Sequence, residues 1–226
     1  MSDIESSSTP RRGFLGRLAA GAVGLAAGGL VTKAGAQPRG RIDSLWADSW
    51  IKRINGDRRQ VFDAMEINSG LPLAMAYLWI QSNHEADQID MDEICAVVVL
   101  RHNAIAMAMN TTIWAKYQLG AANQITDPLT KQPATRNIYS AAMGFPMAPF
   151  ANAAIDKMVA AGVIFCACNV ALNVASADAA AKAGVTKEVA LQDWTAGVLP
   201  GITVVPSGVY AVGRAQDKEC RYCNVT

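Results

Sequence analysis

The apolar run EICAVVVLRH, residues 93–102, constrains the fold of this chain more than any other feature. Its consecutive β-branched side chains do not alternate with polar ones, which is typical of a strand buried on both faces of a sheet. Residues 60–67, 162–168 and 201–208 are further strand candidates, and helical patterns separate them. Strands that alternate with helices predict an α/β fold with a mostly parallel sheet, covered on both faces. With an edge strand at 220–225, we expect about five strands.

The segments between these strands have apolar residues at helical spacing. In residues 104–119, for example, Ile105, Met109, Ile113 and Tyr117 form one stripe. Residues 121–148 are instead a long polar connection with three prolines, which predicts a lid or a subunit contact. The helices that we expect span residues 71–80, 104–119, 150–161, 176–183, 187–194 and 209–218.

Residues 1–36 resemble a twin-arginine signal peptide. Arg11 and Arg12 are followed by a moderately apolar, Gly/Ala-rich run, and a small-x-small cleavage site ends at Ala36. The run contains a further arginine and many glycines, so a stable membrane span is not expected. We expect the folded chain to use the twin-arginine export machinery and to begin at Gln37 in the periplasm or another extracytoplasmic space.

The charge of the exported chain is close to neutral. Residues 1–36 hold four of the 20 basic and two of the 19 acidic residues, which leaves a net charge of −1. This charge, without a basic cluster, gives no electrostatic reason to expect nucleic acid as a partner. The length fits one domain, residues 59–226, with a full core.

An N-terminal extension, residues 37–58, precedes this domain. We expect a short helix there, capped by Asp43 or Ser44. Its apolar face is predicted to dock on the main domain or on a neighbouring subunit. This face would consist of Leu45, Trp46, Ser49, Trp50 and Ile54.

Polar and reactive residues gather at the predicted carboxyl ends of the strands. In parallel α/β sheets, ligands bind beyond these ends, where strand-to-helix loops converge. We therefore expect a binding site there. Its candidate residues are Asn68, Arg101, His102, Asn103, Cys166, Cys168, Asn169, Ser207 and Gly208.

Cys168 is the candidate nucleophile of this site. Helix N-termini close to a strand end favour a thiolate, and His102 is a candidate base or hydrogen-bond partner. Strand alternation places Cys166 on the same side as Cys168, so both would share one environment. The alternative is that one or both cysteines are inert core residues, which is common in buried strands. The turn at Ser207 and Gly208 is suited to an anion, or is a structural turn.

Cys220 and Cys223 form a C-x-x-C pair close to the C-terminus. Asn224 stands where a c-type haem motif has histidine, and the pair is a candidate disulfide in an oxidising envelope. A closed zinc site needs two more ligands, so no metal is predicted. The acidic stretch 84–93 lacks calcium-loop spacing, and nucleotide-binding and G-x-S-x-G motifs are missing.

The second half of the chain resembles the DsrE/DsrF-like family. GVIFCACNVAL, residues 162–172, is similar to its GV-x-F-x-x-C-x-N-x-L segment, although Asn169 here directly follows Cys168. GVLPGITVVPSGVYAVGRAQ, residues 197–216, is similar to its L-P-x-(I/V)-x-x-VPSGV segment and the following helix with Gln216.

This resemblance implies a three-layer α/β/α sandwich that assembles into trimers or hexamers. It also implies that Cys168 carries sulfur as a persulfide and that no prosthetic group or other cofactor is needed. Two alternatives stay open. The protein is a non-catalytic small-ligand-binding or oligomeric structural protein, or it is a thiol–disulfide exchanger that uses Cys220 and Cys223.

Overall fold

The computed structural model describes residues 49–141 and 144–225. The predicted signal peptide lies outside the described residues, as do the predicted caps Asp43 and Ser44 and the side chains of Leu45 and Trp46. Among the helices of the described part, none combines the length and the apolar character needed to cross a membrane.

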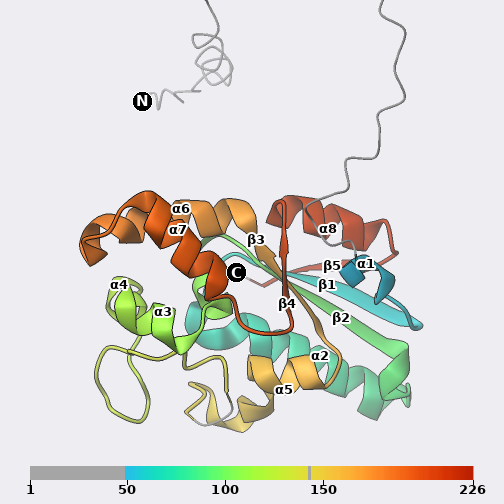
Figure 1. The fold of residues 1–226 in the computed structure, drawn as a ribbon. Helices are drawn as coiled ribbons and strands as arrows, with labels where there is room; N and C mark the ends of the chain where they lie inside the picture. Colours follow the sequence, from blue (N-terminus) through green and yellow to red (C-terminus); the bar gives the residue numbers. More distant parts are fainter. Residues whose placement is uncertain (1–48, 142–143, 226) are drawn as a thin grey trace, which may run out of the picture. The chain divides into compact units, whose positions relative to one another are not determined.

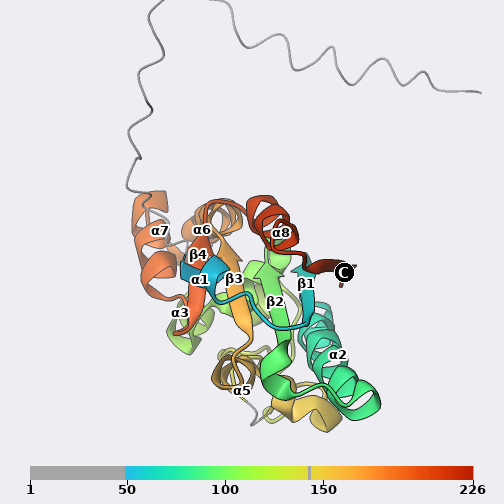
Figure 2. The ribbon, with the colours of Figure 1, turned by 90° about the vertical axis from the view of Figure 1, so that its right-hand side faces the viewer.

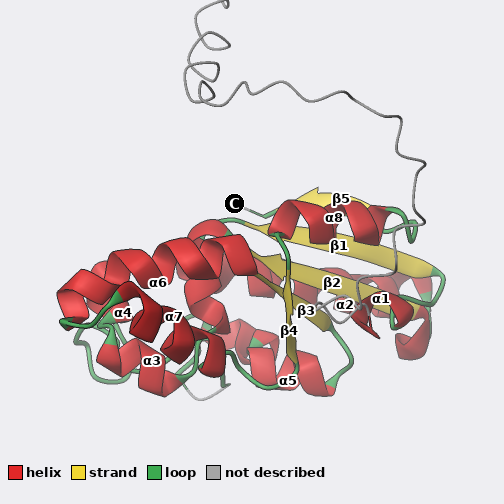
Figure 3. Ribbon diagram, turned by 45° about the horizontal axis from the view of Figure 1, so that its top comes forward, coloured by secondary structure: helices red, strands yellow, loops and turns green. Residues whose placement is uncertain are grey.

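The centre of the structure is a sheet of five parallel strands. Its order is β4-β3-β2-β1-β5, which Figure 3 shows as consecutive yellow strands. The all-parallel pairing confirms the α/β prediction, and β5 forms the expected edge strand. The strands are β1 (Arg58–Ala64), β2 (Ile94–Leu100), β3 (Ile164–Cys168), β4 (Ile202–Val205) and β5 (Arg221–Asn224).

The larger hydrophobic core lies on one face of the sheet. Phe62, Val98 and Phe165 project into it from three adjacent strands, and all are buried. The helices α2 (Leu71–Asp87) and α5 (Ile155–Ala160) lie on this side in Figures 1 and 2. The other α-helices whose residues enter this core are α3 (Thr111–Lys116), α4 (Leu119–Ala122), α6 (Asn169–Ala183) and α7 (Lys187–Ala196).

The opposite face of the sheet is covered by α8 (Gly208–Gln216) and α1 (Ser49–Lys52). Figure 1 shows α8 on the side of the sheet away from α2 and α5. Trp50, Ile51 and Ile54 are buried against strand residues on this face, so the described part of the extension docks on the main domain. Ser49 is exposed, contrary to its predicted place on the apolar face. Helices on both faces complete the three-layer α/β/α sandwich.

The predicted continuous helix over residues 104–119 is wrong. A 3-10 helix, His102–Ala108, ends before Met109, and α3 begins only after Asn110. The Asn110 side chain accepts a hydrogen bond of 3.0 Å from the Ile113 N–H and so caps the N-terminus of α3. Asparagine is one of the residues favoured at this position. Met109 forms an antiparallel backbone bridge with Val198, and this pairing holds the chain in a non-helical conformation between the two helices. Local apolar spacing was therefore overridden by a tertiary contact.

Other predicted helix boundaries also differ from the structure. α6 begins at Asn169 instead of Ser176, and α2 continues to Asp87, beyond its predicted end at residue 80. The predicted helix 150–161 is divided between a 3-10 helix, Ala148–Ala153, and α5. The short 3-10 helices Asn68–Gly70 and Met91–Glu93 precede α2 and β2.

The connection between α4 and α5 is anchored in the core. Its Asn137 is 2% exposed, and the side-chain amide donates hydrogen bonds of 2.8 and 2.6 Å to the carbonyls of Met107 and Met109. Ile138 and Tyr139 are buried beside it. Residues 137–139 therefore hold this segment in the core, whereas a lid or a subunit contact formed by its other residues stays a prediction.

Candidate functional site

The helices that follow the neighbouring strands β3 and β4 pack on opposite faces of the sheet. Leu172 of α6 belongs to the larger core, whereas Ala211 of α8 belongs to the core on the other face. This divergence makes a topological switch point, where a crevice opens beyond the carboxyl ends of parallel strands. A cavity of about 500 Å³ lies there, in the size range of small-molecule sites.

Buried or half-buried residues form the floor of the cavity, and exposed valines form an apolar rim. Arg101, Cys168 and Gly208 contribute to the floor from the ends of three strands. The rim includes Val170, Val174 and Val209, whose exposed fractions are 55%, 58% and 66%. Three valines exposed around one opening form an apolar entrance. The other lining residues are His102, Asn103, Ala171, Ala175, Asp178 and Ser207.

Cys168 is the last residue of β3 and the N-cap of α6. Its Sγ accepts a hydrogen bond of 3.3 Å from the Ala171 N–H, and the residue is 5% exposed. A helix N-terminus stabilises negative charge, and an N–H donor interacts better with a thiolate than with a thiol. The thiol therefore lies on a cavity wall in a setting suited to a nucleophile.

Arg101 is fixed by a bidentate ion pair with Asp63 of β1. Its Nε and Nη2 donate to the two carboxylate oxygens at 2.6 and 2.8 Å, and Asp63 is 3% exposed. The hydroxyl of Tyr222 from β5 donates to Asp63 Oδ2 at 2.9 Å. Hydrogen bonding to Asp63 raises the pKa of Arg101, and the guanidinium also interacts electrostatically with Cys168. Arg101 thus places a permanent positive charge close to the thiol.

Glycine is required at position 208 because its backbone lies close to the Arg101 side chain. A Cβ atom at this position would lie 2.5 Å from Arg101 Cδ and 2.8 Å from Arg101 Cβ. Ser207 caps the helix that begins here, since its Oγ accepts a hydrogen bond of 3.2 Å from the Tyr210 N–H. The predicted Ser207–Gly208 turn therefore lines the cavity, where Gly208 contacts the Arg101 side chain.

His102 and Asn103 lie at the mouth of the cavity, and both contact Glu66. His102 Nδ1 is 3.2 Å from Glu66 Oε1, and Asn103 Nδ2 donates to Oε2 at 2.8 Å. The His102 side chain is 66% exposed. Among the described residues, Cys168 Sγ has a hydrogen bond with the Ala171 N–H and none with His102. The predicted role of His102 as a base in direct contact with the thiol has no support in this geometry.

Three predicted site residues lie elsewhere. Cys166 is fully buried in the core beneath α8, and burial raises the pKa of its thiol. It therefore does not share the environment of Cys168, which opens to the cavity at the strand end. Asn68 lines a separate cavity between the end of β1 and the segment after α4. Asn169 accepts hydrogen bonds from Asn173 within α6 and does not line the site.

The tail cysteines are free thiols in this structure, without the candidate disulfide between them. Cys220 packs in the core beneath α8, while the half-buried Cys223 packs against the larger core. Burial, with a further contribution from Cys95, raises the pKa of Cys220 to about 11, and burial also raises that of Cys223. These features disfavour the pair as a thiolate-based exchanger.

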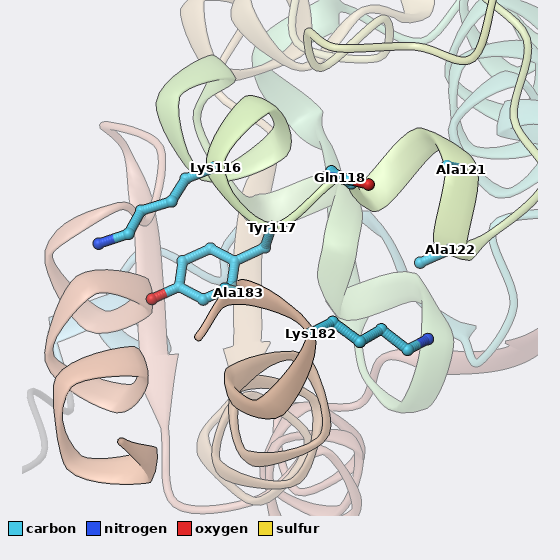
Figure 4. A pocket seen from close by; sticks show the side chains of 7 residues that line it. All are labelled: Lys116, Tyr117, Gln118, Ala121, Ala122, Lys182 and Ala183. Atoms are coloured by element: carbon cyan, nitrogen blue, oxygen red, sulfur yellow. The ribbon is translucent and has the colours of Figure 1, made fainter. Parts of the chain in front are cut away.

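A cavity of about 240 Å³ between α4 and the end of α6 is less suited to chemistry. Figure 4 shows Lys116 and Lys182 extending in opposite directions on either side of Tyr117. The Lys116 amine and the Tyr117 hydroxyl both bind Asp193, each at 2.6 Å. The lysines therefore do not converge on a ligand. Within residues 49–141 and 144–225, no cluster of three or more His, Cys, Asp or Glu side chains is arranged to hold a metal ion.

Sequence reasoning missed Asp63 and Tyr222, which support Arg101 from two other strands. A signal was present for Asp63, because an acidic residue inside the apolar run at 60–67 requires a buried partner. Tyr222 had no comparable signal, since an exposed edge strand commonly contains tyrosine. Val170 and Val174 of the rim were missed because α6 was expected to begin seven residues later.

No family model and no curated protein matches the chain. Among solved structures, it is similar to MTH1491, a protein of unknown function from Methanobacterium thermoautotrophicum. The identity is 18%, the TM-score is 0.39, and the match covers 74% of this chain and 99% of that chain.

Proposed function

We propose that this protein is an exported member of the DsrE/DsrF-like group that carries a sulfur atom as a persulfide on Cys168. The observation that carries the proposal is the position of this thiol. It caps α6 on the wall of the cavity at the topological switch point, within the electrostatic reach of Arg101. The resemblance of residues 162–172 to the family's cysteine segment supports the same residue. Export and assembly into trimers or hexamers are part of this proposal.

The chemistry is a redox-neutral transfer between thiols. The Cys168 thiolate attacks the outer sulfur of a donor persulfide, R–S–SH, and a new S–S bond forms at Cys168. The bond between the two donor sulfurs breaks, and the donor leaves as the thiolate R–S⁻. A second thiolate then attacks the outer sulfur of the loaded Cys168, which regenerates its thiolate. Arg101 supplies a positive charge, and the Ala171 N–H a hydrogen bond, to the sulfur that is negatively charged before attack and after release.

The test is to incubate the reduced protein with glutathione persulfide and to measure its intact mass. We expect a gain of one sulfur atom, and peptide mapping should place it on Cys168. Cys168→Ser should abolish the gain, whereas Cys223→Ser, which removes a half-buried thiol outside the cavity, should retain it. Loading of Cys168→Ser at the wild-type level would refute the proposal.

The cavity also supports a second candidate function, the non-covalent binding of a small ligand. Its volume of about 500 Å³ and its apolar rim are typical of small-molecule pockets. A binding protein does not need the thiol. If native mass spectrometry of purified protein detects a retained small molecule, and Cys168→Ser retains it equally, this second function is favoured.

A further inference from the structure

We propose that Asp63 and Tyr222 are positioning residues that hold the Arg101 guanidinium beside Cys168 and thereby keep this thiol reactive. The inference rests on the proposed function, since it explains how the sulfur-carrying thiol is activated. Neither positioning residue lines the cavity, so both act through Arg101. They belong to β1 and β5, whereas Arg101 and Cys168 follow β2 and end β3.

The Asp63 carboxylate fixes the plane of the guanidinium. Two parallel hydrogen bonds of 2.6 and 2.8 Å join Nε and Nη2 of Arg101 to its two oxygens. A fork of this kind sets orientation as well as distance, which a lysine cannot reproduce. Gly208 leaves room for the aliphatic part of Arg101, because a Cβ there would overlap it. The carboxylate fork therefore holds the guanidinium, while Gly208 leaves space for the methylene groups that carry it.

Tyr222 orients the carboxylate in turn. Its hydroxyl donates to Asp63 Oδ2 at 2.9 Å, the same oxygen that accepts from Arg101 Nη2. Tyr222 is 48% exposed, so core packing does not explain its position. Parallel pairing of Val61 with Tyr222 brings the C-terminal strand to this place. Burial, followed by the hydrogen bond to Asp63, raises the pKa of Tyr222, which keeps the hydroxyl a donor at neutral pH.

Several charged groups surround the thiol, and their effects have opposite signs. Arg101 attracts a negative charge on Cys168, whereas Asp63, which pairs with Arg101, repels such a charge through space. His102, which contacts Glu66, lies at the cavity mouth, and Asp178 projects from α6. Removal of the Asp63 charge alone would make Cys168 easier to ionise. Loss of the Arg101 position would make it harder to ionise. A substitution at Asp63 therefore distinguishes the two effects.

The experiment measures the rate of Cys168 alkylation by iodoacetamide as a function of pH, with peptide mass spectrometry as the readout. For Asp63→Asn we expect the midpoint of the profile to move to higher pH and the rate at pH 7 to fall about tenfold. For Tyr222→Phe we expect a rate roughly threefold lower. Tyr210→Phe is the matched control, because its hydroxyl lies outside the cavity and has no hydrogen bond in the described part of the chain. This control should leave the profile unchanged.

A midpoint that moves to lower pH in Asp63→Asn would show that Asp63 acts only as a through-space charge, and it would overturn the inference. An unchanged Tyr222→Phe profile would overturn the part assigned to Tyr222. If circular dichroism shows that Asp63→Asn does not fold, Arg101→Lys is the variant that tests the inference. It keeps the positive charge but cannot form the two-bond fork with Asp63, so it should also slow alkylation. Alkylation does not depend on sulfur loading. A failed loading experiment with the expected pH shifts would therefore refute the sulfur carrier and leave the positioning of Arg101 standing.

Discussion

Gly208→Ala is the substitution whose consequence follows most directly from the geometry. The new Cβ would lie 2.5 Å from Arg101 Cδ and 2.8 Å from Arg101 Cβ, whereas ordinary carbon contacts are about 3.5–4.0 Å. The Arg101 Cβ is bonded to the backbone, so a change of rotamer does not relieve the overlap. Either α8 or the backbone at Arg101 must therefore move, and a movement of Arg101 would disturb its pair with Asp63.

The expected magnitude is the difference between two terms. Overpacking costs about 1–3 kcal/mol, and the higher helix propensity of alanine returns at most about 1 kcal/mol. We expect Gly208→Ala to lower the free energy of unfolding by about 1 kcal/mol and to slow Cys168 alkylation. Gly213→Ala is the matched control in the same helix, since its Cβ would meet no atom within 4 Å. It should stabilise the protein by about 0.5–1 kcal/mol.

Urea unfolding followed by circular dichroism measures both variants against the wild type. The two substitutions should change the unfolding midpoint in opposite directions. A Gly208→Ala variant that is as stable as Gly213→Ala, with unchanged Cys168 reactivity, would show that the close approach of α8 to Arg101 is not a constraint.

Two further predictions concern the segment that anchors the larger core. Asn137→Ala leaves two buried carbonyls without donors, so we expect a loss of about 3 kcal/mol in unfolding free energy, measured by urea titration; a loss below about 1 kcal/mol would contradict this accounting. Burial raises the pKa of Asp127, but hydrogen bonds from Arg136 and the Leu129 N–H outweigh it, so the net pKa is lowered. A lowered pKa stabilises the fold above the unfolded value of about 3.9, and this contribution is lost as the pH falls through the folded value. The stability difference between wild type and Asp127→Asn should therefore be constant at neutral pH and shrink below about pH 4, and a difference that grows there would refute the ion-pair argument.

The strands could be predicted from the sequence because a strand buried on both faces has a local signature. The run at 93–102 contains β2, and the run at 162–168 ends at Cys168, where β3 ends. Each of these two strands contributes to both cores, so nearly all of its side chains must be apolar. Helix boundaries were less predictable, as the break at Asn110 shows, because a distant backbone pairing decided it.

The sequence by itself determined the sheet, its parallel direction and the reactive residues that would follow each strand. Tertiary structure alone decided which of these residues meet. Cys168 and Arg101 share a cavity because α6 and α8 leave neighbouring strands for opposite faces, and Asn68 is excluded because it lies elsewhere on the same edge. Asp63 and Tyr222 are 159 residues apart and meet only through strand pairing. Side-chain identity is local information, whereas the face that a helix covers depends on how all the apolar surfaces are buried together.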